Sequence, residues 1–132
     1  MTLDLDWLAA ELRTFAEERN WNQFHTPKNL VMAMVGEVGE LSAEFQWLSP
    51  QESEPEQLSD RSRQAIENEI ADVMIYLVRL ADRLDVDLKQ AVEDKLESNR
   101  SRYTIANSYG SSAKIEDAPP QVDTQSRAST SV

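Results

Sequence analysis

The sequence contains no cysteine and only one histidine in 132 residues. The lack of cysteine excludes disulfide bonds and thiolate metal sites, and a single histidine is too few for a histidine-rich metal site. Glycine occurs three times and proline five times. Because hairpins and short strands need frequent turn residues, this scarcity favours long helices.

Long apolar runs are also absent, and none approaches the roughly 20 residues of a membrane-spanning helix. The opening stretch, MTLDLDWLAAELRTF, lacks the basic region and the continuous apolar segment of a signal peptide, so we expect a cytoplasmic protein that does not bind membranes. The net charge is −11, and a field of this sign repels the phosphate backbone of nucleic acids. A small phosphate ligand remains open, because it can arrive with a metal ion that carboxylates hold.

Four segments with apolar residues at every third or fourth position predict helices. They cover about residues 4–19, 27–47, 63–84 and 87–103. Asp87 is the expected N-cap of the fourth helix. Four helices with short connections predict an all-α fold, an antiparallel four-helix bundle. Since the apolar content of the chain is modest, we expect oligomerisation to complete the core.

The composition changes after the fourth predicted helix. From Thr104 onward, serine, glycine and a pair of adjacent prolines dominate, with few large apolar residues. This change predicts one helical domain over residues 1–103, followed by a polar and flexible tail over residues 104–132.

Two pairs of acidic residues lie on consecutive predicted helices. Glu37 and Glu40 belong to the second helix, and Glu69 and Asp72 belong to the third. Side chains three residues apart are neighbours on a helix, and a carboxylate beside a buried face is costly unless it is paired or binds a cation. If the two helices pack together, the four carboxylates converge and raise each other's pKa. Mg²⁺ fits this set best, because it prefers carboxylate, water and phosphate oxygens.

A second interpretation of these acids remains open. Glutamates are common on exposed helix faces, so the acidic edge can also be the docking surface of a non-catalytic interaction module. A di-iron carboxylate bundle is excluded, because it needs Glu-x-x-His on two helices and His25 follows no glutamate at that spacing.

Aromatic side chains flank the acidic pairs along the chain. Flat side chains suit stacking on a base ring, although each of them alone can equally cap the core of the bundle. They are Trp21, Phe24, Trp47 and Tyr76, with His25 beside them. Basic and amide groups near the end of the fourth helix can meet phosphate oxygens, or the cations can simply complement the helix dipole. They are Lys95, Asn99, Arg100 and Arg102.

Taken together, these motifs resemble the all-α nucleoside triphosphate pyrophosphatases of the MazG-like group, and within it the dCTP pyrophosphatase branch. The resemblance covers about residues 5–103. The segments that carry it are WNQFHTPKNL (21–30), GEVGELSAEFQW (36–47), EIADVMIYLVRLA (69–81), and VDLKQAV with KLESNRSRY (86–103).

The resemblance implies hydrolysis of a nucleoside triphosphate, dCTP or a modified dCTP, to the monophosphate and pyrophosphate. It implies Mg²⁺ bound by the catalytic acids Glu37, Glu40, Glu69 and Asp72. It implies nucleotide contacts from Trp21, Asn22, Gln23, Phe24, His25, Trp47, Tyr76, Lys95, Asn99 and Arg102. It also implies a site built between the subunits of a homodimer, often within a homotetramer.

Three positions depart from the pattern of this family. Leu12 stands where related sequences can offer a histidine to the nucleotide, which leaves the base preference open. Glu44 stands where an apolar residue is expected, either as an outer acid of the site or as a solvated one. Thr104 stands where proline is expected.

The expected mechanism follows from charge. Mg²⁺ neutralises the phosphates in the transition state, and a water molecule oriented by Glu37 or Glu40 attacks the α-phosphorus in line. The sequence does not choose between these two glutamates.

Overall fold

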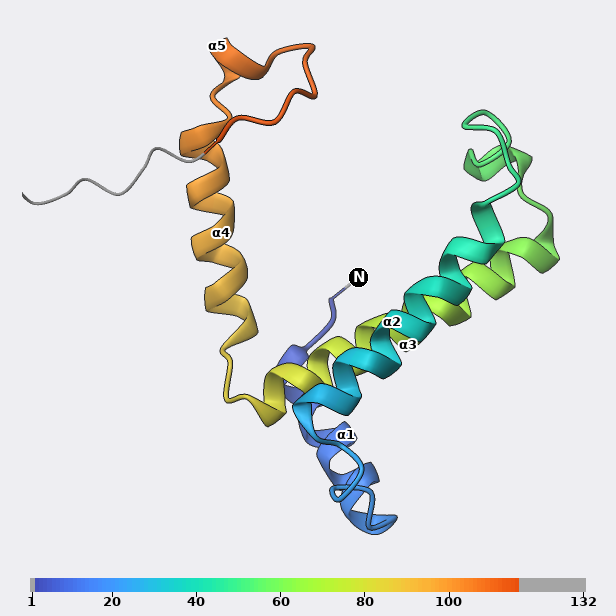
Figure 1. The fold of residues 1–132 in the computed structure, drawn as a ribbon, viewed down its shortest axis with the longest axis vertical. Helices are drawn as coiled ribbons and strands as arrows, with labels where there is room; N and C mark the ends of the chain where they lie inside the picture. The colour runs from blue at the N-terminus through green and yellow to red at the C-terminus, as the bar shows by residue number, and fades with distance from the viewer. Residues whose placement is uncertain (1, 117–132) are drawn as a thin grey trace, which may run out of the picture. The chain divides into compact units, whose positions relative to one another are not determined.

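The structure, a computed structural model, describes residues 2–116 of the chain. Within this range the chain is helical and has no strand, which confirms the predicted all-α class (Figure 1). The elements are α1 (Leu5–Glu18), α2 (Pro27–Phe45), the short 3-10 helix η1 (Pro55–Gln57), α3 (Asp60–Arg83), α4 (Leu88–Arg102) and α5 (Ile105–Ser108). None of the helices in residues 2–116 is long and apolar enough to cross a membrane. Of the predicted flexible tail, residues 117–132 lie outside the described residues.

Side-chain caps fix where the first three long helices begin. The Oδ1 of Asp4 accepts hydrogen bonds from the backbone N–H groups of Asp6 and Trp7, each over 3.0 Å, at the start of α1. Thr26 caps α2 in the same way, and Pro27 occupies its first turn. Ser59 caps α3, which begins at Asp60, three residues before the predicted start, because the first turn of this helix is polar and shows no apolar periodicity.

The ends of α1 and α3 share one backbone feature. Asn20 has a φ of 54° and Asp85 a φ of 53°, the left-handed conformation that Asn and Asp tolerate better than most residues. Each residue therefore turns the chain out of its helix and into a short connection. After the second of these turns, the Oδ1 of Asp87 accepts a hydrogen bond from the backbone N–H of Gln90 over 2.9 Å, so the predicted cap of α4 is confirmed.

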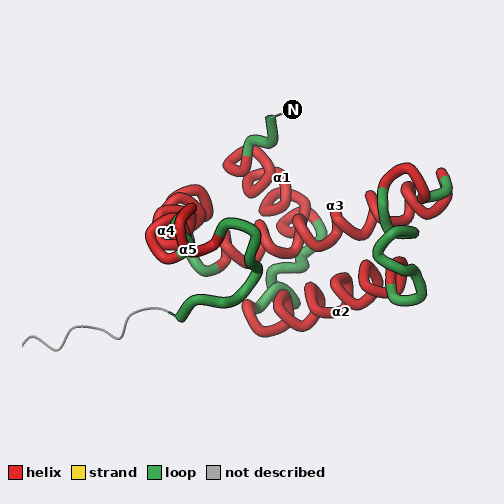
Figure 2. Tube along the Cα trace, turned by 90° about the horizontal axis from the view of Figure 1, so that it is seen from above, coloured by secondary structure: helices red, strands yellow, loops and turns green. Residues whose placement is uncertain are grey.

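The chain divides into two compact units, Met1–Ala91 and Val92–Val132. In the first unit α2 and α3 run side by side, and α1 packs on α3 (Figure 2). The buried apolar side chains are few: Ala16, Leu30, Ile66, Val78 and Ala81. The second unit contains most of α4 and all of α5. The closed four-helix bundle therefore stays a prediction, because α4 crosses the boundary between the units.

Candidate functional site

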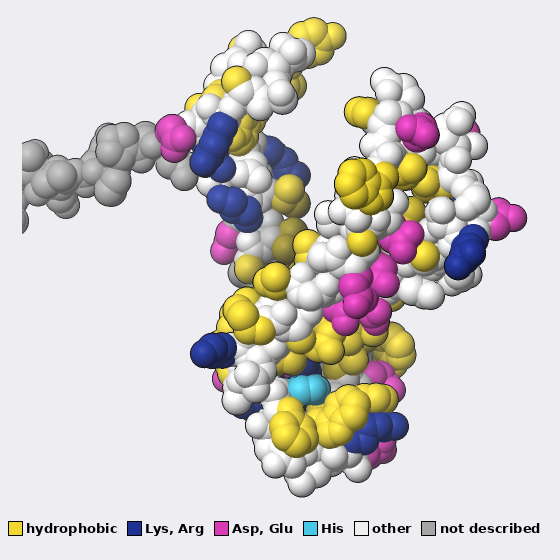
Figure 3. Space-filling model, turned by 45° about the vertical axis from the view of Figure 1, so that its right-hand side comes forward, with side chains coloured by type: hydrophobic (Ala, Val, Ile, Leu, Met, Phe, Trp, Pro, Cys, Tyr) yellow, Lys and Arg dark blue, Asp and Glu magenta, His cyan; other side chains and the backbone are white. Residues whose placement is uncertain are grey.

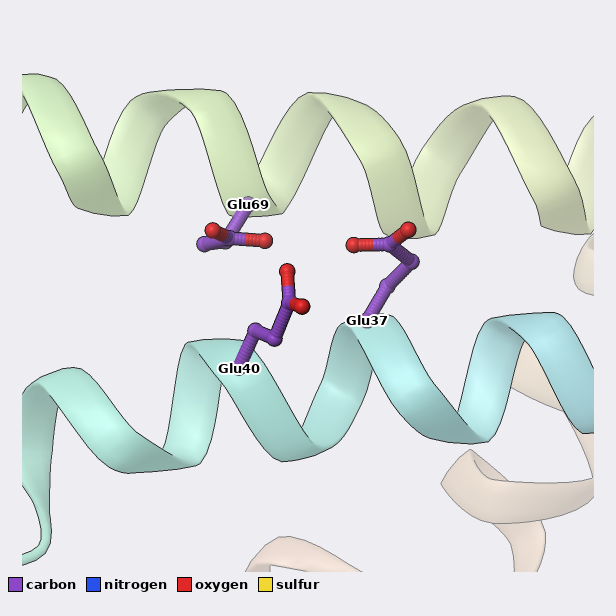
Figure 4. A group of neighbouring side chains, drawn as sticks. All are labelled: Glu37, Glu40 and Glu69. Carbon is purple, nitrogen blue, oxygen red and sulfur yellow. The ribbon is translucent and has the colours of Figure 1, made fainter.

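Three carboxylates meet between α2 and α3. Glu37 and Glu40 extend from α2 and Glu69 from α3, and the three side chains point toward one another (Figure 4). One carboxylate oxygen of each lies within 4.8 Å of the others. The side-by-side packing of the two helices thus produces the convergence of acids that their spacing predicts. We call Glu37, Glu40 and Glu69 the acid cluster.

The acid cluster is electrostatically unfavourable as it stands. Desolvation raises the pKa of Glu37, and the charges of Glu40 and Asp72 raise it further. Desolvation also raises the pKa of Glu69, followed by the effects of Glu40 and Asp72. In the described part of the chain, one buried oxygen of Glu37 and one of Glu69 have no hydrogen-bond partner. A cation with oxygen ligands would relieve both the repulsion and the unsatisfied oxygens.

Asp72, the fourth predicted acid, borders the cluster without joining the group of three. Its charge contributes to the raised pKa of both Glu37 and Glu69. It also lines, together with Glu37, a pocket of about 350 Å³. Asp72 therefore links the acid cluster to the adjoining cavity.

The pocket combines aromatic, apolar and charged walls. Its lining residues are Leu12, Phe15, Trp21, His25, Glu37, Asp72, Ile75, Tyr76 and Arg79. Phe15 meets Trp21 edge to face with 5.6 Å between ring centroids, and Trp21 meets His25 at 6.0 Å. On the surface, acidic side chains form a patch next to hydrophobic side chains (Figure 3). A cavity with flat walls beside a group of carboxylates suits a ligand that carries a ring and a charged, metal-binding part.

Three of the predicted nucleotide-contacting residues, Trp21, His25 and Tyr76, line this pocket. Others of the same loop do not. The Oδ1 of Asn22 accepts a hydrogen bond from the Nη2 of Arg79 over 2.8 Å, and the Nε2 of Gln23 donates to a backbone carbonyl over 3.0 Å. Phe24 is 59% exposed.

The remaining predicted contacts lie elsewhere. Trp47 follows the C-terminal end of α2, is 86% exposed and does not line the pocket. Lys95, Asn99 and Arg102 lie on α4 in the second unit, where the Nη2 of Arg102 donates to the Oδ1 of Asn99 over 2.9 Å.

Arg79 is a site residue that the sequence analysis missed. It is only 4% exposed and lines the pocket. Its Nη1 donates to Asp82 over 3.0 Å, and Arg13 forms a second ion pair with the same carboxylate. The signal was present in the sequence, because Glu69, Asp72, Tyr76 and Arg79 fall within an arc of about 80° on one helix. Arg79 is the one charged residue in the apolar run VMIYLVRLA, and it is the last of these four residues along the helix.

His25 lies between two arginines of α3. The Nε of Arg79 donates to its Nδ1 over 3.2 Å, and the Nε of Arg83 donates to its backbone carbonyl over 3.1 Å. Burial lowers the pKa of His25, and the charges of Arg79 and Arg83 lower it further. The ring is therefore expected to stay neutral at physiological pH.

Comparison with known proteins adds a family and several relatives. A family model described as the MazG-like family matches residues 33–117. A dCTP pyrophosphatase 1 from Bos taurus is 48% identical over 114 residues, which cover 86% of this chain and 68% of that protein. The proteins of the same name from Mus musculus and Homo sapiens are 51% and 50% identical over 105 residues, 80% of this chain and 62% of theirs. The chain therefore spans about two thirds of the length of these relatives.

One solved structure is also similar. A pyrophosphatase from Archaeoglobus fulgidus superimposes with a TM-score of 0.70 at 38% sequence identity, covering 79% of this chain and 95% of that one. The similarity therefore extends over most of the described helices.

Proposed function

The chain belongs to the MazG-like family, and we propose that it hydrolyses a nucleoside triphosphate to the monophosphate and pyrophosphate. The observation that carries the proposal is the acid cluster beside an aromatic pocket. We assign dCTP or a modified dCTP as the substrate, on the support of the relatives named dCTP pyrophosphatase 1. In this reading the acid cluster faces the phosphates and the pocket receives the nucleoside.

The donor set of the cluster fits Mg²⁺. All three side chains offer carboxylate oxygens, which lie within 4.8 Å of one another, and two of these side chains keep a buried oxygen without a partner among residues 2–116. We propose that Glu37, Glu40 and Glu69 hold the ion together with Asp72. When bound, Mg²⁺ supplies the positive charge that offsets the phosphates of the substrate and of the transition state.

The proposed reaction breaks one phosphorus–oxygen bond. A water oxygen attacks the α-phosphorus, the bond from this phosphorus to the oxygen bridging the α- and β-phosphates breaks, and pyrophosphate leaves. Glu37 and Glu40 are the two candidates to orient this water and take its proton.

The walls of the pocket are assigned to the nucleoside. Trp21 and Tyr76 provide flat surfaces, and His25 provides a polar group next to them. The remaining loop residues, Asn22, Gln23 and Phe24, support this wall. Such contacts orient the substrate so that its α-phosphorus faces the acids, and they do not take part in the chemistry.

Further contacts are proposed from a completed assembly. Met32 and Val35 on α2 are each 59% exposed, and Ile70 on α3 is 52% exposed. Apolar side chains exposed along neighbouring helices favour association with another subunit. We therefore propose a homodimer or homotetramer in which a closed helical bundle forms. There Trp47 contacts the nucleoside, and α4 brings its polar side chains, Lys95, Asn99 and Arg102, to the phosphates.

Substitution of a cluster acid tests the proposal. We expect Glu40→Gln to lower turnover of dCTP by at least about a hundredfold, because a metal ion contributes several kcal/mol to such reactions, while the circular dichroism spectrum stays helical. Glu67→Gln, at an exposed position of the same α3 that carries Glu69, is the matched control and should keep its turnover. Wild-type turnover in Glu40→Gln would favour the interaction-module interpretation of the acidic edge instead.

A further inference from the structure

The loop between α1 and α2 is tied to α3 by the buried side chain of Arg79 and by the exposed side chain of Arg83, which donates to the backbone carbonyl of His25. Arg79 donates to the Nδ1 of His25 over 3.2 Å and to the Oδ1 of Asn22 over 2.8 Å. The N-terminal end of the same loop is fixed to α1. There the backbone N–H of Trp21 donates to the carbonyl of Ala16 over 2.8 Å. The part of the loop that lines the pocket is therefore held from both sides.

Arg79 is itself firmly held. Its side chain is 5% exposed, and its Nη1 pairs with Asp82, whose side chain is 16% exposed. Asp82 also accepts two hydrogen bonds from the guanidinium of Arg13 on α1. The guanidinium is thus anchored at one end by a carboxylate, and its other nitrogens face the loop.

The contact between Arg79 and His25 determines where the imidazole carries its proton. A guanidinium has donors only and no acceptor. The Nδ1 that faces it must therefore be the unprotonated nitrogen, which accepts. A neutral imidazole then carries its hydrogen on Nε2. The other charged group that faces His25 is Arg83, and its hydrogen bond goes to the backbone carbonyl of His25, not to a ring nitrogen.

We propose that Arg79 is a positioning residue that fixes the neutral His25 ring with its proton on Nε2, so that His25 offers a hydrogen-bond donor to an acceptor atom of the nucleoside. This inference rests on the proposed function, because it assigns the pocket lined by His25 and Arg79 to the nucleoside. Arg79 thereby becomes part of the site without contacting the nucleoside itself. Arg79 acts through His25, and the donor that results discriminates in favour of nucleosides with an acceptor oxygen or nitrogen at that place.

The single histidine of the chain makes the first half of the proposal directly measurable. Long-range ¹H–¹⁵N correlation of ¹⁵N-labelled wild-type protein at pH 8 reports the tautomer of His25 without interference from other imidazoles. We expect one neutral tautomer, protonated on Nε2. A ring protonated on Nδ1, or an equal mixture of tautomers, would overturn the proposal without any variant.

Two variants on α3 separate the role of Arg79 from simple support of the loop. Arg79→Met removes the donor to Nδ1 and should allow a mixture of tautomers. Arg83→Met removes the donor to the backbone carbonyl of the same residue and should keep the Nε2 tautomer. Arg79→Lys retains one donor and should restore the tautomer in part, and it also serves if Arg79→Met does not fold. An unchanged tautomer in Arg79→Met, or in Arg79→Lys where the methionine variant does not fold, would overturn the assignment to Arg79.

Kinetics with dCTP and Mg²⁺ test whether His25 donates a hydrogen bond to the nucleoside. A mixture of tautomers leaves only part of the rings with a donor on Nε2, so Arg79→Met should raise KM about two- to fivefold. The contact binds the substrate and the transition state alike, so kcat should stay nearly unchanged. Arg61→Met, an exposed arginine in the first turn of α3, controls for the loss of a positive charge and should keep the wild-type KM. A changed tautomer with an unchanged KM would overturn the contact to the nucleoside. If wild-type protein turns over no triphosphate, the proposed function fails and this contact fails with it, whereas the NMR result still decides the role of Arg79.

Discussion

The carboxylate of Glu37 on α2 and that of Glu69 on α3 meet between the two helices, and each keeps one buried oxygen without a hydrogen-bond partner in the described part of the chain. The two residues are far apart in the sequence, and the packing of α2 against α3 brings them together. Such an arrangement costs stability in the absence of a cation and is stabilised by one. The same arrangement therefore lowers the stability of the metal-free chain and provides the ligands for the proposed chemistry.

Glu37→Gln is expected to stabilise the metal-free protein at pH 8. The amide removes one negative charge from the acid cluster, and with it the repulsion that raises the pKa of its neighbour. We expect the melting temperature without divalent ions to rise by a few degrees, and the further increase that Mg²⁺ gives the wild type to be lost. Thermal unfolding followed by circular dichroism, with chelator and with Mg²⁺, measures both effects. A variant that is less stable than wild type in chelator would contradict the strained cluster.

The effect of Glu37→Gln should depend on pH. The pKa of Glu37 is raised above its ordinary value of 4.5, so the folded chain binds this proton more tightly than the unfolded chain. The stability that follows is complete below pH 4.5 and is lost as the pH rises through the raised pKa. The melting-temperature difference between the variant and the metal-free wild type should therefore be small at pH 4.5 and grow toward pH 8. A difference that is constant over this range would contradict the shift.

Asp82→Ala is expected to lower the free energy of unfolding by about 2–3 kcal/mol, because it leaves the buried guanidinium of Arg79 without its carboxylate. Arg13→Ala should cost much less, since Arg13 is 52% exposed and Arg79 still pairs with Asp82. Urea unfolding of the two variants against wild type gives both values. Equal losses would show that Arg79 gains little from the pair.

The pairing of Asp82 with the two arginines also makes the free energy of unfolding depend on pH in the acid range. Hydrogen bonding from Arg13 holds the pKa of Asp82 below its ordinary value of 3.8. The contribution of the pair is therefore present above pH 3.8 and is lost as the pH falls through the lowered pKa. Wild type and Asp82→Ala should converge in stability at the lowest pH at which both still fold cooperatively.

Substitution of Trp47 tests whether the site lies between subunits. Trp47 is 86% exposed in the single chain and does not line the pocket, so a site complete in one chain would not need it. If the site lies between subunits, Trp47→Ala should raise the KM for dCTP about tenfold, in the range of a lost stacking contact. Trp7→Ala, at an aromatic residue on α1 that is 56% exposed and lies outside the pocket, is the matched control and should keep the wild-type KM.

Mixing two inactive or weakened variants sharpens this test. When Glu40→Gln and Trp47→Ala chains are unfolded together and refolded as mixed assemblies, some sites receive both intact side chains from different subunits. Activity above that of either variant alone would support a shared site. No gain in assemblies that sedimentation shows to be mixed would place both residues in one subunit's site.

The helices were largely predictable from the sequence. Their apolar periodicity located all four long helices, with ends that differ from the structure by at most three residues. The largest difference lies at the start of α3, where the helix begins at Asp60, capped by Ser59, ahead of any apolar repeat. The single turn of α5 falls in the predicted tail, where a threonine cap without an apolar repeat gave no periodic signal.

The site was predictable in part. The spacing of Glu37 and Glu40, and of Glu69 and Asp72, indicated convergence, and the packing of α2 on α3 brings three of these acids together. The spacing of the four acids did not predict that Asp72 borders the pocket and stays outside the acid cluster. Which acids meet depends on how far α2 is shifted along α3, and sequence spacing within one helix does not determine that shift. Arg79 was missed because its partners on the loop, Asn22 and His25, are distant in sequence.

Product analysis of the wild-type chain tests whether it hydrolyses a nucleoside triphosphate between the α- and β-phosphates. Purified protein is incubated with dCTP, and in parallel with each other common nucleoside triphosphate, in Mg²⁺ or in chelator, and the mono-, di-, pyro- and orthophosphate products are resolved. We expect dCMP and pyrophosphate in equal amounts from dCTP, only with Mg²⁺ present. No turnover of any triphosphate, or release of dCDP and orthophosphate, would rule out the proposed reaction.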